Sequence, residues 1–259
     1  MRIVAHTCSN TEIVCALGRA DWLVGTDEHS DFPPEVVSRL PRIGKDLDVD
    51  PEKVLALKPD LVITSLTVPG HEHVVAKLAA ARLPMIVLAP KSVADVAENL
   101  RLVGRVLGVP ERGEALATEL TDALDAPPPP ADAPRVLVEW WPKPVIAAAR
   151  QSWVDDLLRA AGAHNALGDQ DLSSATLQPA DAVALAPDAV VISWCGVPAS
   201  HYRADVVTRR AGWEAVPAVA RGQVHPISEA YLGRPGPRLI DGLRALRGVV
   251  AAARQARDR

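Results

Sequence analysis

The feature that most constrains the fold of this 259-residue chain is an internal repeat. Residues 51–65 (PEKVLALKPDLVITS) align with residues 179–193 (PADAVALAPDAVVIS) at a constant offset of 128 positions. Both prolines, the aspartate after the second proline and the final serine are identical in the two copies. Each copy predicts a short helix that begins at its first proline, followed by a turn and a buried strand. Two such units, separated by a helical segment, indicate two similar α/β lobes.

Strand and helix patterns alternate through both halves of the chain. Apolar strands are expected at Arg2–His6, Trp22–Thr26, Leu61–Ser65 and Met85–Ala89, and again at Arg135–Glu139, Ala189–Trp194 and Val224–Ile227. Strands separated by helices of ordinary length imply βαβ units, so the predicted fold class is α/β with two Rossmann-like lobes and parallel sheets. A helical stretch over 92–124, broken at Gly108, separates the halves. We therefore place the first lobe at 1–109, a linking helix with a proline-rich linker at 110–134, and the second lobe at 135–259.

Composition and charge exclude several classes of function. The formal net charge is −4, and lysine and arginine form no basic stripe, which argues against the phosphate contacts of a nucleic-acid-binding protein. No apolar run approaches the roughly 18 residues that a membrane-spanning helix needs. The first residues, MRIVAHTC, carry no apolar signal region, so we expect a cytoplasmic protein, or a periplasmic or cell-surface one if a leader has been removed. The spacing of Cys8, Cys15 and Cys195 fits neither a disulfide framework nor a zinc motif.

The predicted sheets also predict where a ligand binds. In open parallel sheets, ligands lie beyond the carboxyl ends of the strands, and two facing lobes would place two such edges around one cleft. The candidates that follow strands of the first half are Cys8, Ser9, Asn10, His29, Ser65 and Leu66. Those of the second half are Trp140, Trp141, Trp194, Cys195 and Tyr231. Six tryptophans against two tyrosines and one phenylalanine suit a large, flat, amphipathic ligand, because indole offers a broad apolar face with one donor.

The chain carries no recognisable catalytic motif. It lacks a nucleophile elbow, a phosphate-binding loop, a glycine-rich dinucleotide motif and an HExxH pair, so we expect no catalytic residues and no catalytic cofactor. The cluster His71-Glu72-His73 is expected to be an exposed turn rather than a metal site. The remaining histidines that could reach a cleft show no spacing typical of metal ligands, so no metal site is predicted. They are His6, His29, His201 and His225.

Four segments together resemble the cobalamin-binding proteins of bacterial ABC importers. These segments are Ser9–Glu12, Ser30–Pro34, Glu52–Ile63 and Arg234–Arg238, and the resemblance extends over nearly the whole chain. It implies the class III substrate-binding-protein fold, in which a single long backbone helix joins the two lobes. It also implies that a corrin ring lies flat in the cleft, against Cys8–Asn10, His29, Trp140, Trp141, Trp194, Tyr231 and Arg234. Family members often carry an aromatic residue where His29 and Ser65 stand here, and Cys8 or His29 could instead approach the cobalt.

In importer-coupled members of that family, one surface glutamate of each lobe docks on the membrane transporter. Glu52 matches the first of these, whereas the repeat places Ala180 at the second position, next to Asp181. We therefore expect reversible, non-catalytic binding of cobalamin or another corrinoid. The missing glutamate favours intracellular retention of the ligand, or its handover to a cytosolic acceptor, over delivery to an ABC transporter.

Three alternatives stay open at this point. The chain could be an ABC-importer substrate-binding protein for cobalamin, or one for a ferric siderophore or haem. A haem receptor would need an axial ligand, for which Tyr202 and His201 are the nearest candidates. A corrinoid-salvage enzyme would use Cys8 or Cys195 as its nucleophile, which requires a neighbouring base or helix terminus to favour the thiolate.

Overall fold

Two units with separate sheets make up the chain in a computed structural model, which describes residues 1–258. The first lobe comprises Met1–Pro90 and Asp95–Glu119, and the second comprises Lys91–Ala94 and the chain from Leu120 onward. Among the described residues, no helix combines the length and the apolar character that crossing a membrane would require.

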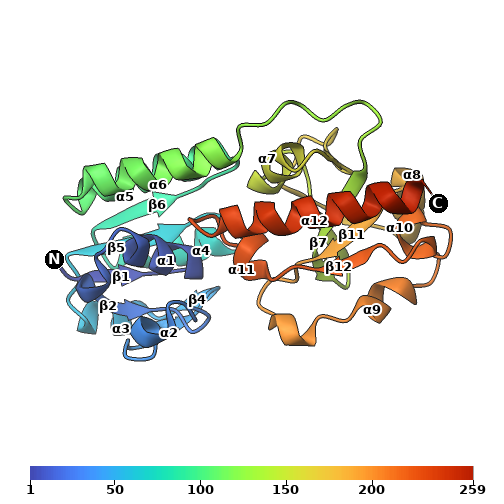
Figure 1. Ribbon diagram of the computed structural model, residues 1–259. Coiled ribbons are helices and arrows are strands. Elements are labelled where there is room, and N and C mark those ends of the chain that lie inside the picture. Colours follow the sequence, from blue (N-terminus) through green and yellow to red (C-terminus); the bar gives the residue numbers. More distant parts are fainter. Residues whose placement is uncertain (259) are drawn as a thin grey trace. The chain divides into compact units, whose positions relative to one another are not determined.

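The first lobe is built on a four-stranded parallel sheet in the order β2-β1-β5-β6 (Figure 1). Its strands are β1 (Ile3–Ala5), β2 (Leu23–Thr26), β5 (Leu61–Ser65) and β6 (Met85–Leu88), and a small antiparallel hairpin pairs β3 (Gly44–Lys45) with β4 (Asp48–Val49). The helices are α1 (Cys8–Ala16), the 3-10 turn η1 (Ala20–Trp22), α2 (Pro34–Val37), α3 (Pro51–Ala56), α4 (His71–Ala80), α5 (Val93–Val106) and α6 (Pro110–Ala123). Because the four strands are parallel, their carboxyl ends meet at one side of the sheet, which we call the first edge.

The second lobe contains a mixed sheet in the order β10-β8-β7-β11-β12, with β9 paired to β7. Its strands are β7 (Arg135–Pro142), β8 (Val145–Ala148), β9 (His164–Asn165), β10 (Ser174–Leu177), β11 (Ala189–Ile192) and β12 (Val224–Pro226). The helices are α7 (Trp153–Ala160), α8 (Pro179–Leu185), the 3-10 turn η2 (Ala199–His201), α9 (Ala204–Thr208), α10 (Pro217–Ala220), α11 (Glu229–Leu232) and α12 (Leu239–Arg257). The parallel strands β7, β11 and β12 have their carboxyl ends at what we call the second edge. The antiparallel strands β8 and β10 were not expected from the sequence, because alanine or serine makes up half of each and neither residue type favours strands.

The internal repeat is also a structural repeat. The first copy forms α3 and β5 and the second forms α8 and β11, so both copies place a helix before a central parallel strand. The chain reverses direction at Lys58 (φ 48°) in the first copy and at Ala186 (φ 43°) in the second, which are equivalent positions. Left-handed backbone is uncommon for residues with a side chain, so its recurrence at equivalent positions confirms that the two lobes are variations of one unit.

The aspartate shared by the two copies has the same role in each lobe. Asp60 accepts a hydrogen bond from the backbone N–H of Arg2 (2.7 Å), just before β1. Asp188 accepts one from the backbone N–H of Arg135 (2.9 Å), where β7 begins. In both lobes the carboxylate therefore fixes the start of the neighbouring central strand, which explains why the Pro-Asp pair is kept in both copies.

The segment expected to link the lobes is helical over only part of its length. α6 ends at Ala123, and no helix spans 124–134. α6 packs closely against α5, because a Cβ placed on Gly113 would lie 2.7 Å from the carbonyl oxygen of Leu100 and 3.1 Å from the Cα of Gly104. Glycine at these two facing positions lets the helices lie side by side (Figure 1).

Candidate functional site

Buried polar side chains form the floor of the first edge. Asn10 donates hydrogen bonds to the backbone oxygen of His6 (2.7 Å) and to the Ser65 hydroxyl (2.9 Å). Ser9, Asn10 and Ser65 are all buried and hydrogen-bonded within the lobe. These three predicted ligand contacts therefore hold the loop after β1 against the end of β5, and they offer little surface of their own.

The exposed part of the first edge is contributed by other predicted residues. His29 is exposed, Leu66 has 44% of its surface exposed, and Cys8 is half-buried at the start of α1. The loop that presents His29 is held by Asp27, whose carboxylate accepts hydrogen bonds from the His29 N–H (2.8 Å) and from the Ser30 hydroxyl (2.7 Å). A ligand at this edge would meet His29 and Leu66 before it met the serines.

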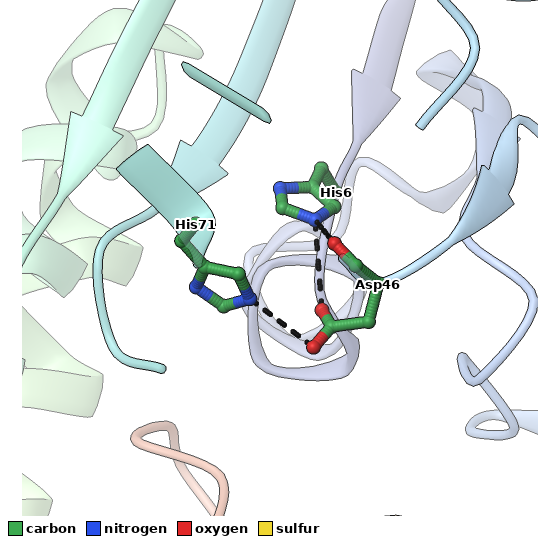
Figure 2. A group of neighbouring side chains, drawn as sticks. All are labelled: His6, Asp46 and His71. Atoms are coloured by element: carbon green, nitrogen blue, oxygen red, sulfur yellow. Dashed lines mark hydrogen bonds and ion pairs between the residues drawn. The ribbon is translucent and has the colours of Figure 1, made fainter. Parts of the chain in front are cut away.

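A cluster of two histidines and one aspartate also lies at the first edge (Figure 2). His6 follows β1, His71 opens α4, and Asp46 lies between β3 and β4. The Nε2 atom of His71 lies 3.1 Å from one carboxylate oxygen of Asp46, and that of His6 lies 3.5 Å from the other. The expectation that the histidines at 71 and 73 form an exposed turn is wrong for His71, which is 1% exposed, and correct for His73, whose side chain is 82% exposed.

Both histidines were noted from the sequence, but their contact with Asp46 was not predicted, because the three residues are far apart in the chain and Asp46 belongs to a very short hairpin. Burial alone would raise the pKa of Asp46, but hydrogen bonds from His6 and His71 outweigh it and hold that pKa well below its ordinary value. Asp46 is therefore ionised at neutral pH. Two imidazoles and one carboxylate in mutual contact are a donor set that borderline metals accept.

The second edge presents tryptophans of different exposure. Trp141 is 42% exposed, and its ring is oriented by a hydrogen bond from Nε1 to the backbone oxygen of Lys143 (3.0 Å). Trp140 is half-buried and packs against Trp153 with the ring centroids 6.0 Å apart. Among the described residues, Trp140 Nε1 is a buried donor with no hydrogen-bond partner. Trp141 thus offers an exposed ring face, whereas Trp140 is packed inside the lobe with its N–H buried.

Trp194 belongs to the core rather than to the exposed part of the second edge. It is 5% exposed, and its Nε1 donates to Glu139 (2.9 Å) within β7. Arg210 holds both carboxylate oxygens of Glu139 at 2.9 Å. Glu139 and Arg210 were not predicted, because an ion pair between residues 71 positions apart leaves no local pattern in the sequence.

Tyr202, Glu229 and Arg234 are already engaged with protein groups at the second edge. The Tyr202 hydroxyl donates to the backbone oxygen of Trp194 (2.9 Å) and accepts from the Glu229 N–H (3.1 Å), and burial raises the pKa of this phenol. Arg234 is 7% exposed and pairs with Glu229 at 2.6 Å. Tyr231 and Cys195 are half-buried beside them.

Within the described residues the three cysteines form no disulfide. Burial, with a smaller contribution from the charges of Glu12 and Glu35, raises the pKa of the Cys15 thiol to about 11. Because alkylating reagents attack the thiolate, we expect Cys15 in a Cys8→Ser/Cys195→Ser variant to react very slowly at pH 8. Its rate should rise roughly tenfold per pH unit until the pH approaches about 11. Mass spectrometry after timed iodoacetamide treatment measures this, and a rate that levels off near pH 9 would contradict it.

Comparison with known proteins identifies relatives along the whole chain. A sequence profile of the family described as "Periplasmic binding protein" matches residues 3–231. The ABC transporter substrate-binding lipoprotein YvrC of Bacillus subtilis is 28% identical over 256 residues, covering 95% of this chain and 78% of that protein. The vitamin B12-binding protein of Vibrio cholerae is 26% identical over 250 residues, covering 93% of this chain and 86% of that protein.

Solved structures give the same result for the fold. The periplasmic heme-binding protein RhuT from Roseiflexus sp. RS-1, in its apo form, is 30% identical and superposes with a TM-score of 0.81, covering 97% of this chain and 98% of that one. The predicted class III substrate-binding-protein fold is therefore confirmed. The prediction of a cytoplasmic protein is wrong, because these relatives are periplasmic proteins or a lipoprotein.

Proposed function

Since the chain belongs to the periplasmic binding protein family, we propose that it captures a corrinoid such as cobalamin and presents it to an ABC importer. Proteins of this family bind ligands without transforming them, so a salvage enzyme with a cysteine nucleophile is set aside. Intracellular retention, expected from the sequence, is also set aside because a relative is a transporter-linked lipoprotein. The vitamin B12-binding relative supports the choice of ligand.

The observation that carries the proposal is the exposed ring of Trp141 at the second edge. A corrin is broad, flat and partly apolar, and an oriented indole with 42% of its surface exposed offers a matching face. Trp140, packed against Trp153, adjoins Trp141 in β7 and is proposed as a second, half-buried contact. At the first edge, His29 and Leu66 supply the exposed groups that we propose as further contacts.

The charged and phenolic groups of the second edge favour a corrinoid over the two rival ligands. Both hydrogen-bonding positions of the Tyr202 hydroxyl are occupied, and its raised pKa disfavours the phenolate that a haem iron would require. The guanidinium groups of Arg210 and Arg234 are paired with buried or half-buried glutamates. Neither arginine is therefore available to attract an anionic ferric siderophore.

Glu52 is our candidate contact with the transporter. It is exposed in the first turn of α3. In the second lobe the equivalent residue is Ala180, and the neighbouring Asp181 carboxylate accepts a hydrogen bond from the Gln178 N–H (2.8 Å) in a capping box. Docking through carboxylates would thus rely more on the first lobe than on the second.

A titration with cyanocobalamin, followed by tryptophan fluorescence and visible absorption, tests the proposal. We expect saturable quenching for the unaltered protein and at least roughly tenfold weaker binding for Trp141→Ala, because the stacking face is lost. Val183→Ala is the matched control, since Val183 is 39% exposed on α8, at the far end of β11 from the second edge. Absence of saturable quenching, or tighter binding of haemin than of cyanocobalamin, would contradict the corrinoid assignment.

A further inference from the structure

The cluster formed by His6, Asp46 and His71 is not explained by the binding of an organic ligand. We propose that these three side chains bind one divalent transition-metal ion of the zinc class. All three lie in the first lobe, and the two imidazoles are 0% and 1% exposed, so they cannot approach a metal held inside a macrocycle. A small ion can reach them past Asp46, whose side chain is 26% exposed. The site would therefore be separate from the corrinoid contacts.

The ligand atoms already lie at distances that a small ion can bridge. The three residues can each offer one ligand atom such that all three atoms lie within 4.8 Å of one another (Figure 2). A tetrahedral ion with bonds of about 2.0–2.2 Å holds its ligands roughly 3.3–3.5 Å apart, close to the separations of 3.1 and 3.5 Å between the carboxylate of Asp46 and the two rings. Three protein ligands leave one position for water or another small ligand.

The scaffold fixes these three side chains before any ion arrives. His6 and His71 follow β1 and β5, which are hydrogen-bonded neighbours in the sheet. The β3–β4 turn is tied to them, because Nε2 of His6 donates to the backbone oxygen of Asp46 (2.7 Å). The rings meet edge to face with their centroids 5.1 Å apart. Preorganised ligands on rigid elements lower the cost of assembling a site.

In the metal-free cluster the proton of each ring is on Nε2, because Nε2 of His6 donates to the Asp46 backbone oxygen and Nδ1 of His71 faces two backbone N–H groups. Coordination through Nε2 therefore requires each proton to shift to Nδ1, since Nε2 must offer its lone pair. For His6 the outer partner is present: Oγ1 of Thr64 lies 2.7 Å from Nδ1 and can accept that proton, as in many metal-binding histidines. Nδ1 of His71 lies 3.3 Å from the backbone N–H groups of Thr67 and Val68. These contacts are longer than ordinary hydrogen bonds, so moving the His71 proton to Nδ1 would give up only two weak interactions.

The test uses tag-free protein stripped of metal with EDTA, in the absence of any corrinoid. We expect Zn²⁺ to bind with a stoichiometry of one by calorimetry, and Co²⁺ to give intense visible absorption typical of tetrahedral coordination. His71→Ala and Asp46→Asn should each weaken Zn²⁺ binding at least ~100-fold, and Thr64→Val about 10-fold through loss of the outer partner. Zn²⁺ should also raise the melting temperature of the unaltered protein but not that of His71→Ala.

His73→Ala is the matched control, because His73 lies on the same helix two residues away and its side chain is 82% exposed. It should bind Zn²⁺ as the unaltered protein does. Circular dichroism identifies any variant that fails to fold. If His71→Ala or Asp46→Asn does not fold, Zn²⁺ binding by Thr64→Val and the Co²⁺ spectrum of the unaltered protein test the proposal instead. Lack of stoichiometric Zn²⁺ binding, or equal losses in His73→Ala and His71→Ala, would overturn the proposal. Cyanocobalamin binding is measured in a separate experiment, and its result does not affect the test of the zinc site.

Discussion

Replacing Arg210 by methionine is expected to lower the free energy of unfolding by about 3–5 kcal/mol, because it leaves a buried charge without its partner. Glu139 is 0% exposed, and Arg210 binds both of its carboxylate oxygens at 2.9 Å. The guanidinium also lies 4.2 Å above the Trp213 ring, so its removal loses packing as well as charge. Chemical denaturation followed by circular dichroism measures the change.

Two further variants separate the charge effect from simple loss of an arginine. The double variant Arg210→Met/Glu139→Gln should recover at least half of the lost stability, because a neutral amide oxygen still accepts from Trp194. Arg244→Met removes an exposed partner of Asp241 and should cost less than about 0.5 kcal/mol. A loss below about 1 kcal/mol in Arg210→Met would show that Glu139 does not depend on this partner.

Gly242→Ala is expected to destabilise the second lobe by about 1–3 kcal/mol through overpacking. A Cβ on Gly242 would collide with the backbone oxygen of Tyr231 and would lie 2.8 Å from Cδ2 of Leu232. Both contacts are with α11 or its end, so α12 would have to move away from α11. Because Tyr231 is a proposed ligand contact, the variant should also weaken cyanocobalamin binding.

The same helix supplies the control for this prediction. Gly248 lies on the exposed face of α12, and a Cβ there meets nothing within 4 Å. Gly248→Ala should therefore raise the free energy of unfolding by roughly 0.5–1 kcal/mol, since alanine loses less backbone entropy than glycine in a helix. Thermal melts of the two variants side by side should shift in opposite directions. Shifts of the same sign would refute the packing argument.

The fold was predictable because its signals are local and repeated. The two prolines and the aspartate of each repeat mark a helix start, a turn and a strand start within fifteen residues, and both copies form that unit around Asp60 and Asp188. The antiparallel strands Val145–Ala148 and Ser174–Leu177 were not predicted because alanine or serine makes up half of each, and these residues do not favour strands. Such strands are recognisable only once a neighbouring strand is present to pair with them.

The exposure of side chains near strand ends was predicted less accurately than the strands themselves. The sequence placed Trp141 and Trp194 equally at the second edge, yet one is 42% exposed and the other 5% exposed and bonded to Glu139. The structure extends β7 through Trp141 to Pro142, where it pairs with β8, so Trp141 lies within the strand and not after it. Its ring is held by the bond to the Lys143 backbone oxygen, a contact that residue spacing does not encode.

The sequence by itself determined the two α/β lobes, the parallel strands at their centres and the edges where a ligand could bind. Only the tertiary structure brought His6, Asp46 and His71 together and paired Arg210 with Glu139. The physical reason is the sequence separation over which each effect acts. Periodicity and turn preferences involve residues only a few positions apart, so they can be recognised in the local sequence. A buried charge, by contrast, takes its partner from any segment that the fold places beside it, and that segment is known only when the chain has folded.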